Sequence, residues 1–551
     1  MNFQKYKKAY YPVPIKNRKW PDNEITKAPI WCSVDLRDGN QALINPMSIE
    51  QKLDFFTFLV KIGFKEIEVG FPAASDTEFA FVRTLIDEGL IPDDVTIQVL
   101  TQSRPHIIDQ TIKAISGAKN AVVHLYNSTS ELQRRVVFGK SRDEITRLAV
   151  DGAKRVYDSC SKIPGVRYEY SPETFVGTEM EYAAEICNSV LEVFSPTPQN
   201  KVIINLPSTI EMSTPNVYAD QVEYMSGAIN NRENVVISVH AHNDRGCGVA
   251  STELAVLAGA DRVEGTLFGN GERTGNADIL VLALNLYSQG IDPGLDFSNI
   301  EEVIEKYENV TELEVHPRHP YAGELVYTAF SGSHQDAIKK GMDYSKEHES
   351  PYWENPYLPI NPVDLGRSYE PIRINSQSGK GGIAFVLQKK FGIMAPKEML
   401  YEFSLKVTDV SDTKKAELTP DFIYNMFKDE YANIETRVKL LDYKVATYGD
   451  HTEVAANMLI DGEQRNFTGE GNGPLDAISN IIREQLLENL EIAVYHEHAL
   501  EHGSRSRAMA YVGIKQNGSG IFWGAAAHTN ISTASIKALL SAVNRCLENN
   551  T

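Results

Sequence analysis

The stretch VVISVHAHND, residues 235–244, decides how this chain folds. Successive side chains of a β-strand point to opposite faces, so His240 and His242 project from the same face of one strand. The run before them is apolar and β-branched, which is typical of a strand buried on both sides. Polar residues begin only where the strand ends, and parallel α/β folds place their chemistry at that end. The pattern predicts a buried parallel strand that ends in a chelating pair of imidazoles.

A second His-x-His pair, His496 and His498 in VYHEHAL, provides an internal comparison. A bare pair is as compatible with one packed and one surface histidine as with a metal site. We find no carboxylate and amide partners for the second pair at similar strand ends in the sequence, so we interpret it as structural. The residues that surround each pair distinguish the two.

Strand-like runs alternate with amphipathic helical runs over the first half of the chain, which is the pattern of a parallel sheet. The eight strand-like runs begin at Ile30, Lys65, Val95, Asn120, Val166, Lys201, Val235 and Asp261, and helical candidates include residues 48–62, 76–88, 178–194, 217–230 and 248–258. Eight βα units in roughly 260 residues predict a (β/α)8 TIM barrel, whose active-site groups gather at the carboxyl ends of the strands. A doubly wound open sheet is the competing fold, but no Gly-rich dinucleotide or P-loop fingerprint follows the first strand.

The second half of the chain has a different organisation. Residues 297–436 break the alternation and contain a Pro-rich aromatic segment and the element SQSGKGG, which lacks P-loop spacing, so we expect a linker or lid. Residues 437–551 contain two copies of three strands and a helix, which predicts a small α/β domain with internal two-fold symmetry. In both copies a loop of small residues leads into a helix N-terminus, which favours an anion such as an amino-acid carboxylate. The expected segments are an N-terminal arm (1–30), a barrel (31–296), linker and lid subdomains (297–436) and an α/β domain (437–551).

Composition excludes several classes of partner. The 551 residues include 54 Lys and Arg against 74 Asp and Glu, which gives a net charge of −20 and repels phosphate backbones and anionic lipid. No apolar run reaches membrane-spanning length and no signal peptide is evident, so we expect a cytoplasmic protein without nucleic-acid or membrane partners. The five cysteines are scattered and lack C-x-x-C spacing, which predicts reduced thiols. Cys32, in the first strand, is expected in the core.

Polar residues stand at the ends of most of the predicted strands. Alone, each is as compatible with a helix cap or a loop as with a site. A barrel would bring all of these strand ends to one rim. The set comprises Asp35, Arg37, Asp38, Glu68, His124, Ser171, Glu173, Asn205, Thr209, His240, His242, Asn243 and Asn276.

The rim residues suit a metal-assisted reaction on a small oxo acid. Asp38 with His240 and His242 suits a divalent metal with open positions, and Asn276 could supply a weak fourth oxygen. A metal held in this way would chelate a 2-oxo acid and polarise its ketone. Arg37 could stabilise an enolate or thioester oxyanion, and Glu173 is a candidate for removing a proton from carbon. These residues predict carbon–carbon bond chemistry but leave its direction and substrate open.

Several motifs occur in order and together resemble one enzyme family. VDLRDGNQAL, EIEVGFPAAS, EYSPETF, INLPSTIEMSTPN, HAHNDRGCGVA and GTLFGNGERTGN are similar to motifs of the 2-isopropylmalate synthases of leucine biosynthesis. That superfamily also includes the homocitrate and citramalate synthases and the hydroxymethylglutaryl-CoA lyases. The resemblance covers essentially the whole chain, and residues 437–551 resemble the family's leucine-sensing domain. Short-form members have Glu where this chain has Asn40, and the long form, with SQSGKGG and GNGPL, matches better.

The resemblance implies a Claisen-type acyltransferase that condenses acetyl-CoA with 3-methyl-2-oxobutanoate and hydrolyses the thioester to give 2-isopropylmalate and CoA. It implies a divalent metal, Mg²⁺ first and Mn²⁺ or Zn²⁺ as alternatives, a monovalent activator such as K⁺, a homodimer and feedback inhibition by leucine. The implied residues, by role, are metal ligands Asp38, His240, His242 and Asn276; oxo-acid contacts Arg37, His124, Ser171 and Thr209; proton-transfer groups Glu173 and His334 with a lid tyrosine, Tyr357 before Tyr369; and leucine contacts Gly471, Asn472, Gly473, Ala527 and Thr529.

Three alternatives stay open at this point. Homocitrate or citramalate synthesis would differ only in the oxo acid. A lyase or aldolase on the same barrel would run in the cleavage direction. A leucine-binding regulator with an inactive barrel is disfavoured because the candidate metal ligands and Arg37 are all present.

Overall fold

A computed structural model describes residues 2–6, 8–329, 331–367, 380–414, 418–500, 506–516, 518 and 520–549. The chain forms two compact units. The first comprises residues 1–326 and 363–367, and the second comprises residues 327–362 and 368–551. This division differs from the four segments expected from the sequence, whose boundaries stay a prediction.

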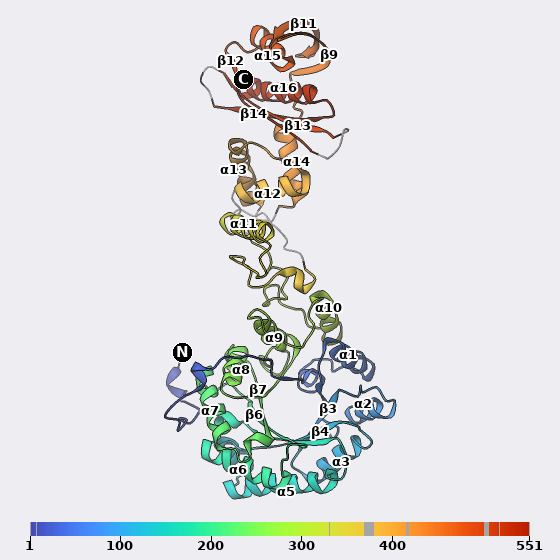
Figure 1. Cartoon of the computed structure of the whole chain (residues 1–551), viewed down its shortest axis with the longest axis vertical. Helices are drawn as coiled ribbons and strands as arrows, with labels where there is room; N and C mark the ends of the chain where they lie inside the picture. Colours follow the sequence, from blue (N-terminus) through green and yellow to red (C-terminus); the bar gives the residue numbers. More distant parts are fainter. Residues whose placement is uncertain are drawn as a thin grey trace. The chain divides into compact units, whose positions relative to one another are not determined.

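The first unit is built on a closed barrel of eight parallel strands, as predicted. Neighbouring strands pair in chain order, and β8 closes the ring by pairing with β1. The strands are β1 (Ile30–Ser33), β2 (Glu66–Gly70), β3 (Thr96–Gln102), β4 (Ala121–Ser128), β5 (Val166–Glu173), β6 (Val202–Ser208), β7 (Val235–Ala241) and β8 (Arg262–Gly265). The helices surround them (Figure 1): α1 (Ile49–Ile62), α2 (Asp76–Asp87), α3 (Pro105–Ala114), α4 (Glu131–Gln133), α5 (Arg142–Cys160), α6 (Met180–Phe194), α7 (Pro215–Ala228), α8 (Gly248–Leu257), α9 (Ile279–Tyr287) and α10 (Ile300–Thr311).

Local sequence fixes where the barrel helices begin and end. α1 starts with a capping box, in which Ser48 Oγ accepts from the Gln51 N–H and the Gln51 side chain accepts from the Ser48 N–H. It ends at Gly63, whose φ of 120° lies in the left-handed region that favours glycine. α5 starts with the same box, formed by Ser141 and Glu144. These caps set the register that turns each helix's apolar face toward the strands.

The first unit extends beyond the last barrel helix expected from the sequence. α10 packs against α1, where Lys306 Nζ lies 2.7 Å from Asp54 Oδ2 and Lys61 pairs with Glu302. The N-terminal arm is attached as well, because the Arg18 guanidinium makes two 2.7 Å hydrogen bonds to the Asp220 carboxylate of α7. Arg18 of the arm and helix α10 therefore both lie against barrel helices.

The second unit contains helices followed by two copies of one motif, as the repeat in the sequence predicts. Its helices are α11 (Gly332–His348), α12 (Lys380–Phe391), α13 (Lys397–Lys414) and α14 (Pro420–Tyr431). The first copy is β9 (Val438–Tyr448), β10 (His451–Ile460), β11 (Glu463–Gly471) and α15 (Pro474–Gln485), and the second is β12 (Leu490–Ala499), β13 (Ala508–Gln516), β14 (Phe522–His528) and α16 (Ile531–Asn549). Each copy forms an antiparallel sheet, and α15 and α16 share one apolar core with both sheets. Helices α12–α14 form a further core with β13 and β14.

Over the part of the chain that the structure describes, no helix is both long and apolar enough to cross a membrane. None of the five cysteines, all of which lie in the described part of the chain, forms a disulfide, and Cys32 is fully buried in β1, as predicted.

Candidate functional site

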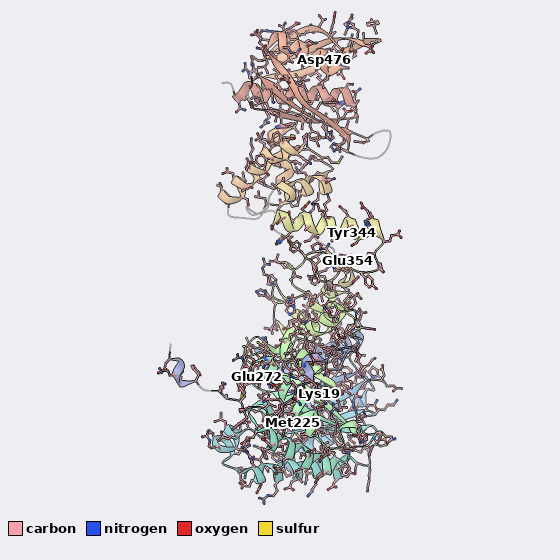
Figure 2. The ribbon with its side chains drawn as sticks, turned by 60° about the vertical axis from the view of Figure 1, so that its left-hand side comes forward. Lys19, Met225, Glu272, Tyr344, Glu354 and Asp476 are labelled. Atoms are coloured by element: carbon pink, nitrogen blue, oxygen red, sulfur yellow. The ribbon has the colours of Figure 1, made fainter. Side chains whose placement is uncertain are left out.

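The carboxyl ends of the barrel strands surround a cavity of about 300 Å³. Polar side chains predicted from separate strands meet there, and carbon-rich side chains complete the wall. The lining residues are Arg37, Asp38, Gln41, Phe71, Leu100, His124, Tyr126, Ser171, Glu173, Asn205, Pro207, Thr209, His240, His242, Glu272 and Arg273. Glu272, on the loop after β8, is exposed on the barrel unit (Figure 2). One small cavity thus collects side chains whose positions span more than 200 residues of sequence.

Three buried side chains in this cavity form a compact set of ligand atoms. Asp38 Oδ2 lies 3.2 Å from His240 Nε2 and 3.7 Å from His242 Nε2. One ligand atom from each residue lies within 4.8 Å of the other two. The two imidazole rings stack with their centroids 5.3 Å apart, as expected for residues on one face of β7 and its extension. The carboxylate and both imidazoles can therefore reach one ion.

A fourth oxygen faces the same point. Asn276 Oδ1 lies 3.0 Å from His240 Nε2, while Asn276 Nδ2 donates a 2.9 Å hydrogen bond to the Asn270 carbonyl. His242 and Asn276 also form an isolated β-bridge. The structure therefore places the acceptor end of the amide, and not its donor end, beside the three predicted ligands.

The turn after β1 presents Arg37 and Asp38 to the cavity. Residues Asp35–Gly39 form one turn of π-helix, a conformation often found at functional sites. Arg37 donates hydrogen bonds to the carboxylates of Asp38 and Glu68, and both ion pairs are largely buried. Asp35 anchors the start of the turn by accepting a 3.0 Å hydrogen bond from the Leu267 N–H. The guanidinium thus holds one oxygen of Asp38, and the other oxygen faces the imidazoles.

Charge pairing determines the protonation of the three candidate ligands. Burial opposes ionisation of Asp38, but Arg37 and His240 outweigh burial and hold the pKa of Asp38 well below its usual range. Burial lowers the pKa of His240, but hydrogen bonds to Asp38 and Glu264 outweigh it and raise the pKa to about 10. Burial and the neighbouring His240 lower the pKa of His242 to about 4. At neutral pH the cluster holds one carboxylate, one protonated imidazole and one neutral imidazole.

These residues suit a divalent cation. The set offers two oxygens and two imidazole nitrogens, which are donors that Mg²⁺, Mn²⁺ and Zn²⁺ accept. His240 Nδ1 lies 2.8 Å from Glu264 Oε2, the carboxylate–histidine arrangement that orients metal-bound imidazoles. His242 Nδ1 is buried and has no hydrogen-bond partner among the described residues. The donors therefore fit a metal, and their chemistry does not determine which one.

Two further predicted residues meet across the cavity wall. His124 Nδ1 lies 2.8 Å from Glu68 Oε2, and His124 Nε2 lies 2.7 Å from Ser171 Oγ. Asn205 Nδ2 donates a 3.0 Å hydrogen bond to the same Ser171 hydroxyl. Glu68 also accepts from Arg37, so this chain of contacts links His124 to the turn that carries Asp38.

The predicted base and the last predicted substrate contact stand on neighbouring strand ends. Glu173, at the end of β5, accepts a hydrogen bond from the Ser128 hydroxyl of β4. Thr209, just after β6, accepts a 2.9 Å hydrogen bond from the Thr174 N–H. Both side chains line the cavity together with Arg37. The structure therefore brings together every barrel residue predicted to bind metal or substrate.

A buried ionic network beneath the cavity was missed in the sequence. The Arg262 guanidinium donates to Glu66 at 2.6 Å, Glu264 at 2.7 Å, Gln98 at 2.7 Å and Ser238 at 2.9 Å. Burial and the charge of Glu264 raise the pKa of Glu169, which lies 3.5 Å from Arg262, well above its usual range. The available signal was charge at alternate positions of strand-like runs, EIE in β2 and RVE in β8, which a polar barrel interior explains.

The predicted residues of the second unit form separate groups. His334 lies in α11, and its ring stacks on Tyr357 with centroids 4.2 Å apart. Tyr369 lies outside the described residues. The predicted leucine contacts are at equivalent places in the two repeats: Gly471, Asn472 and Gly473 lead into α15, and Ala527 and Thr529 lead into α16.

The second His-x-His pair, His496 and His498, packs against an aromatic ring and a carbonyl group. The rings of His496 and His498 stack on Tyr511, and His498 Nε2 donates a 2.8 Å hydrogen bond to the Gly392 carbonyl. The described residues place no Asp or Glu carboxylate with this pair as a metal-ligand group. Packing against an aromatic ring and a carbonyl is consistent with the structural role predicted for it.

Comparison with known proteins gives a consistent result along the chain. Residues 28–306 match the family described as HMGL-like, residues 324–388 match the alpha-isopropylmalate synthase post-catalytic domain-like family, and residues 417–547 match the LeuA allosteric (dimerisation) domain. The chain is 55% identical to the 2-isopropylmalate synthase of Desulfitobacterium hafniense over 551 residues, 99% of each chain. It is 53% identical to that of Helicobacter hepaticus, covering 99% of this chain and 100% of the relative. Among solved structures, the HMG-CoA lyase of Brucella melitensis aligns with 52% of this chain and 100% of its own at 16% identity and a TM-score of 0.42.

Proposed function

Because the chain belongs to the 2-isopropylmalate synthase family, we propose that the barrel cavity is where acetyl-CoA condenses with 3-methyl-2-oxobutanoate. The enzyme is an acyltransferase that converts the acetyl group to an alkyl group on transfer, in the first committed step of leucine biosynthesis. The products are 2-isopropylmalate and CoA. The supporting observation is that ligand atoms of Asp38, His240 and His242 lie close enough together to hold one ion, in a cavity that Arg37 also lines.

The proposed metal ligands are Asp38, His240, His242 and Asn276. A divalent cation there, Mg²⁺ first and Mn²⁺ or Zn²⁺ as alternatives, would polarise the ketone of the oxo acid as a Lewis acid. Glu264 holds a proton on Nδ1 of His240, so a cation would take the place of the second proton, on Nε2. The protein thereby fixes both the charge and the orientation of the site before substrate arrives.

The proposed substrate contacts line the same cavity as the proposed metal ligands Asp38, His240 and His242. Arg37 keeps N–H groups at the rim and stabilises negative charge that develops on the substrate oxygens. His124 and Ser171, held together at 2.7 Å, and Thr209 offer hydrogen bonds to the substrate's oxygens. These contacts would hold the oxo acid in place for attack by the acetyl enolate.

Proton removal from acetyl-CoA is assigned to Glu173 with His334 and Tyr357. Glu173 lines the cavity of the first unit, and His334 and Tyr357 stack on each other in the second unit. Loss of a methyl proton gives the thioester enolate, whose carbon forms a bond to the ketone carbon as the ketone oxygen gains a proton. Water then cleaves the thioester, giving a carboxylate and the CoA thiol, which makes the reaction run one way.

The cavity wall favours a branched aliphatic oxo acid. Phe71, Leu100 and Pro207 supply carbon surface, and Arg273 in the lining is already paired with Asp244. With Arg37 assigned to the ketone and first carboxylate, no unpaired arginine of the lining is left for the second carboxylate of 2-oxoglutarate. The wall therefore supports 3-methyl-2-oxobutanoate over the substrates of homocitrate and citramalate synthases.

A thiol-release assay with acetyl-CoA and a panel of oxo acids tests the substrate. We expect 3-methyl-2-oxobutanoate to exceed pyruvate in kcat/KM by about 10- to 200-fold or more, because each missing methyl or methylene group costs roughly 1–3 kcal/mol of binding in an apolar pocket. Release with pyruvate or 2-oxoglutarate but not with 3-methyl-2-oxobutanoate would reject the assignment.

Metal binding is expected to release a proton and to strengthen as pH rises. Without a cation His240, with its pKa of about 10, is protonated at pH 7, and a metal must displace that proton from Nε2. Affinity for Mn²⁺ should therefore increase about tenfold per pH unit between pH 7 and pH 9. Calorimetry in buffers of different ionisation enthalpy measures the released proton. An affinity that does not change over this range would contradict the assignment of His240.

Leucine is the proposed inhibitor of the full-length enzyme, and it is expected to act through the domain that matches the LeuA allosteric family. The loops 471–473 and 527–529 enter two helices that share one core, which supports a joint ligand site. Thr529 is exposed and can be changed to alanine without disturbing that core. We expect leucine to slow thiol release by the wild type, and T529A to require more leucine for the same inhibition. Thiol release unaffected by leucine would count against this role.

We further propose that the enzyme is a homodimer assembled through this domain and that K⁺ activates it. We also propose that it acts in the cytoplasm, where cysteines without disulfides are stable.

A further inference from the structure

The loop between β8 and α9, residues 269–276 (GNGERTGN), contacts two of the segments that carry proposed metal ligands. Its end lies beside the end of β7, because the Asn243 N–H donates to the Gly275 carbonyl at 2.9 Å and the Ala277 N–H donates to the Ala241 carbonyl at 2.7 Å. Asn276, the last residue of this glycine-rich loop, is therefore held next to His240 and His242 by the backbone.

The orientation of the Asn276 amide depends on Asn270. Asn276 Nδ2 donates to the Asn270 carbonyl at 2.9 Å, which directs Oδ1 to a point 3.0 Å from His240 Nε2. The same Asn270 carbonyl accepts a 2.7 Å hydrogen bond from Thr266 Oγ1. An amide turned the other way would present N–H donors to the cation position, and an N–H donor cannot coordinate a metal.

The side chain of Asn270 reaches the other ligand-bearing segment. Asn270 Nδ2 donates a 3.1 Å hydrogen bond to the carbonyl of Gly39. Gly39 is the last residue of the π-helical turn that presents Arg37 and Asp38. One residue thus connects the turn that supplies the carboxylate with the loop that supplies the amide oxygen.

Two glycines show how closely these segments approach. A Cβ atom on Gly39 would lie 3.2 Å from Asn270 Nδ2, and a Cβ atom on Gly271 would lie 2.3 Å from Asn276 Nδ2. A side chain at Gly271 would displace the Asn276 amide directly. The geometry around both amides therefore leaves little room for another arrangement.

We propose that Asn270 is a positioning residue of the cation site: its side chain ties the loop to the Arg37–Asp38 turn, and its carbonyl aims Asn276 Oδ1 at the cation. This inference rests on the proposed metal ligands and deepens that assignment. Asn270 itself touches neither metal nor substrate. Its removal should therefore weaken metal binding without removing any ligand.

The test is the affinity of the full-length enzyme for Mn²⁺ alone, measured by electron paramagnetic resonance of free Mn²⁺. We expect N270A to bind Mn²⁺ about 10- to 100-fold more weakly than the wild type, the range found when residues behind metal ligands are replaced. The variant G271A should weaken binding in the same direction, because it displaces the Asn276 amide while leaving Asn270 intact. Each variant is also compared with the wild type in metal-free thermal unfolding.

Asn285 of α9 provides a matched control. Its amide makes two hydrogen bonds, donating to Glu253 Oε1 at 2.7 Å and accepting from the Tyr321 hydroxyl at 2.7 Å, whereas the Asn270 amide donates one, to the Gly39 carbonyl. N285A should lose one more side-chain hydrogen bond than N270A and still keep wild-type Mn²⁺ affinity. If N270A and N285A both lose Mn²⁺ affinity in proportion to their loss of thermal stability, the proposal is wrong.

Two other results are decisive. If N270A and G271A bind Mn²⁺ within twofold of the wild type while D38N does not bind it, the positioning role is wrong and the metal site stands. If the wild type and D38N bind Mn²⁺ equally, the proposed metal site is wrong and the positioning role falls with it.

Discussion

Replacing Asp38 with asparagine is expected to lower kcat/KM by roughly a thousandfold or more, because a metal ligand contributes several kcal/mol to the stabilisation of the transition state. The substitution keeps the shape of the side chain and removes its charge. Asp38 supplies the only carboxylate of the proposed ligand set, and it is also an ion-pair partner of Arg37. D38N should therefore lose Mn²⁺ affinity and disturb the guanidinium at the same time.

The thiol-release assay and Mn²⁺ binding should be measured on the same D38N preparation. Asp94 is a suitable control, since its carboxylate lies 2.6 Å from Lys65 Nζ at the exposed surface of the barrel unit. D94N should stay within about twofold of the wild type, because exposed ion pairs contribute little. A D38N enzyme that keeps a tenth of wild-type activity would be incompatible with a catalytic cation at this point.

The second large effect concerns stability: R262M is expected to destabilise the barrel unit by about 3–5 kcal/mol. Arg262 is fully buried and donates hydrogen bonds to Glu66 and Glu264. Removing the guanidinium takes the fully buried cation away from Glu66 and Glu264. Among the described residues only Arg167 and His240 then remain as their ion-pair partners, and burial makes a poorly compensated charge costly. The thermal midpoint of the barrel unit should fall by roughly 10 °C.

Arg155 supplies the matched control for R262M. Its guanidinium also pairs with a carboxylate, through hydrogen bonds of 2.7 and 2.6 Å to Asp109, but the side chains are 45% and 42% exposed. R155M should change stability by less than about 1 kcal/mol. Differential scanning calorimetry measures the thermal midpoint of both variants. Equal shifts of the midpoint in R262M and R155M would show that the buried Arg262 network stabilises the barrel no more than an exposed ion pair does.

The barrel and the contents of its rim could be predicted because both follow from local pattern. Alternate residues of a strand lie on one face, which places His240 and His242 together. Parallel strands end at the same rim of the barrel, which brings Asp38 to them from more than 200 residues away in the sequence. His496 and His498 have the same spacing, but among the described residues they join no metal-ligand group. Spacing identified the candidates, and the partners at neighbouring strand ends distinguished them.

The supporting residues could not be predicted because their roles depend on closure of the barrel. Glu66, Glu169 and Glu264 stand in runs that look like buried strands, where an isolated charge is unfavourable, and they become acceptable only when Arg262 is inside the same ring. The π-helical turn and the contact from Asn270 to Gly39 join segments that are distant in sequence. The repeat of polar and apolar residues within one segment predicts neither the π-helical turn nor this contact.

The most direct measurement is anomalous diffraction from crystals of the enzyme grown with Mn²⁺ and 3-methyl-2-oxobutanoate. The account predicts one strong manganese peak at about 2.0–2.3 Å from an Asp38 oxygen and from one ring nitrogen each of His240 and His242, with the oxo acid chelated to it. A manganese peak elsewhere in the barrel, or an oxo acid bound away from these three side chains, would contradict it.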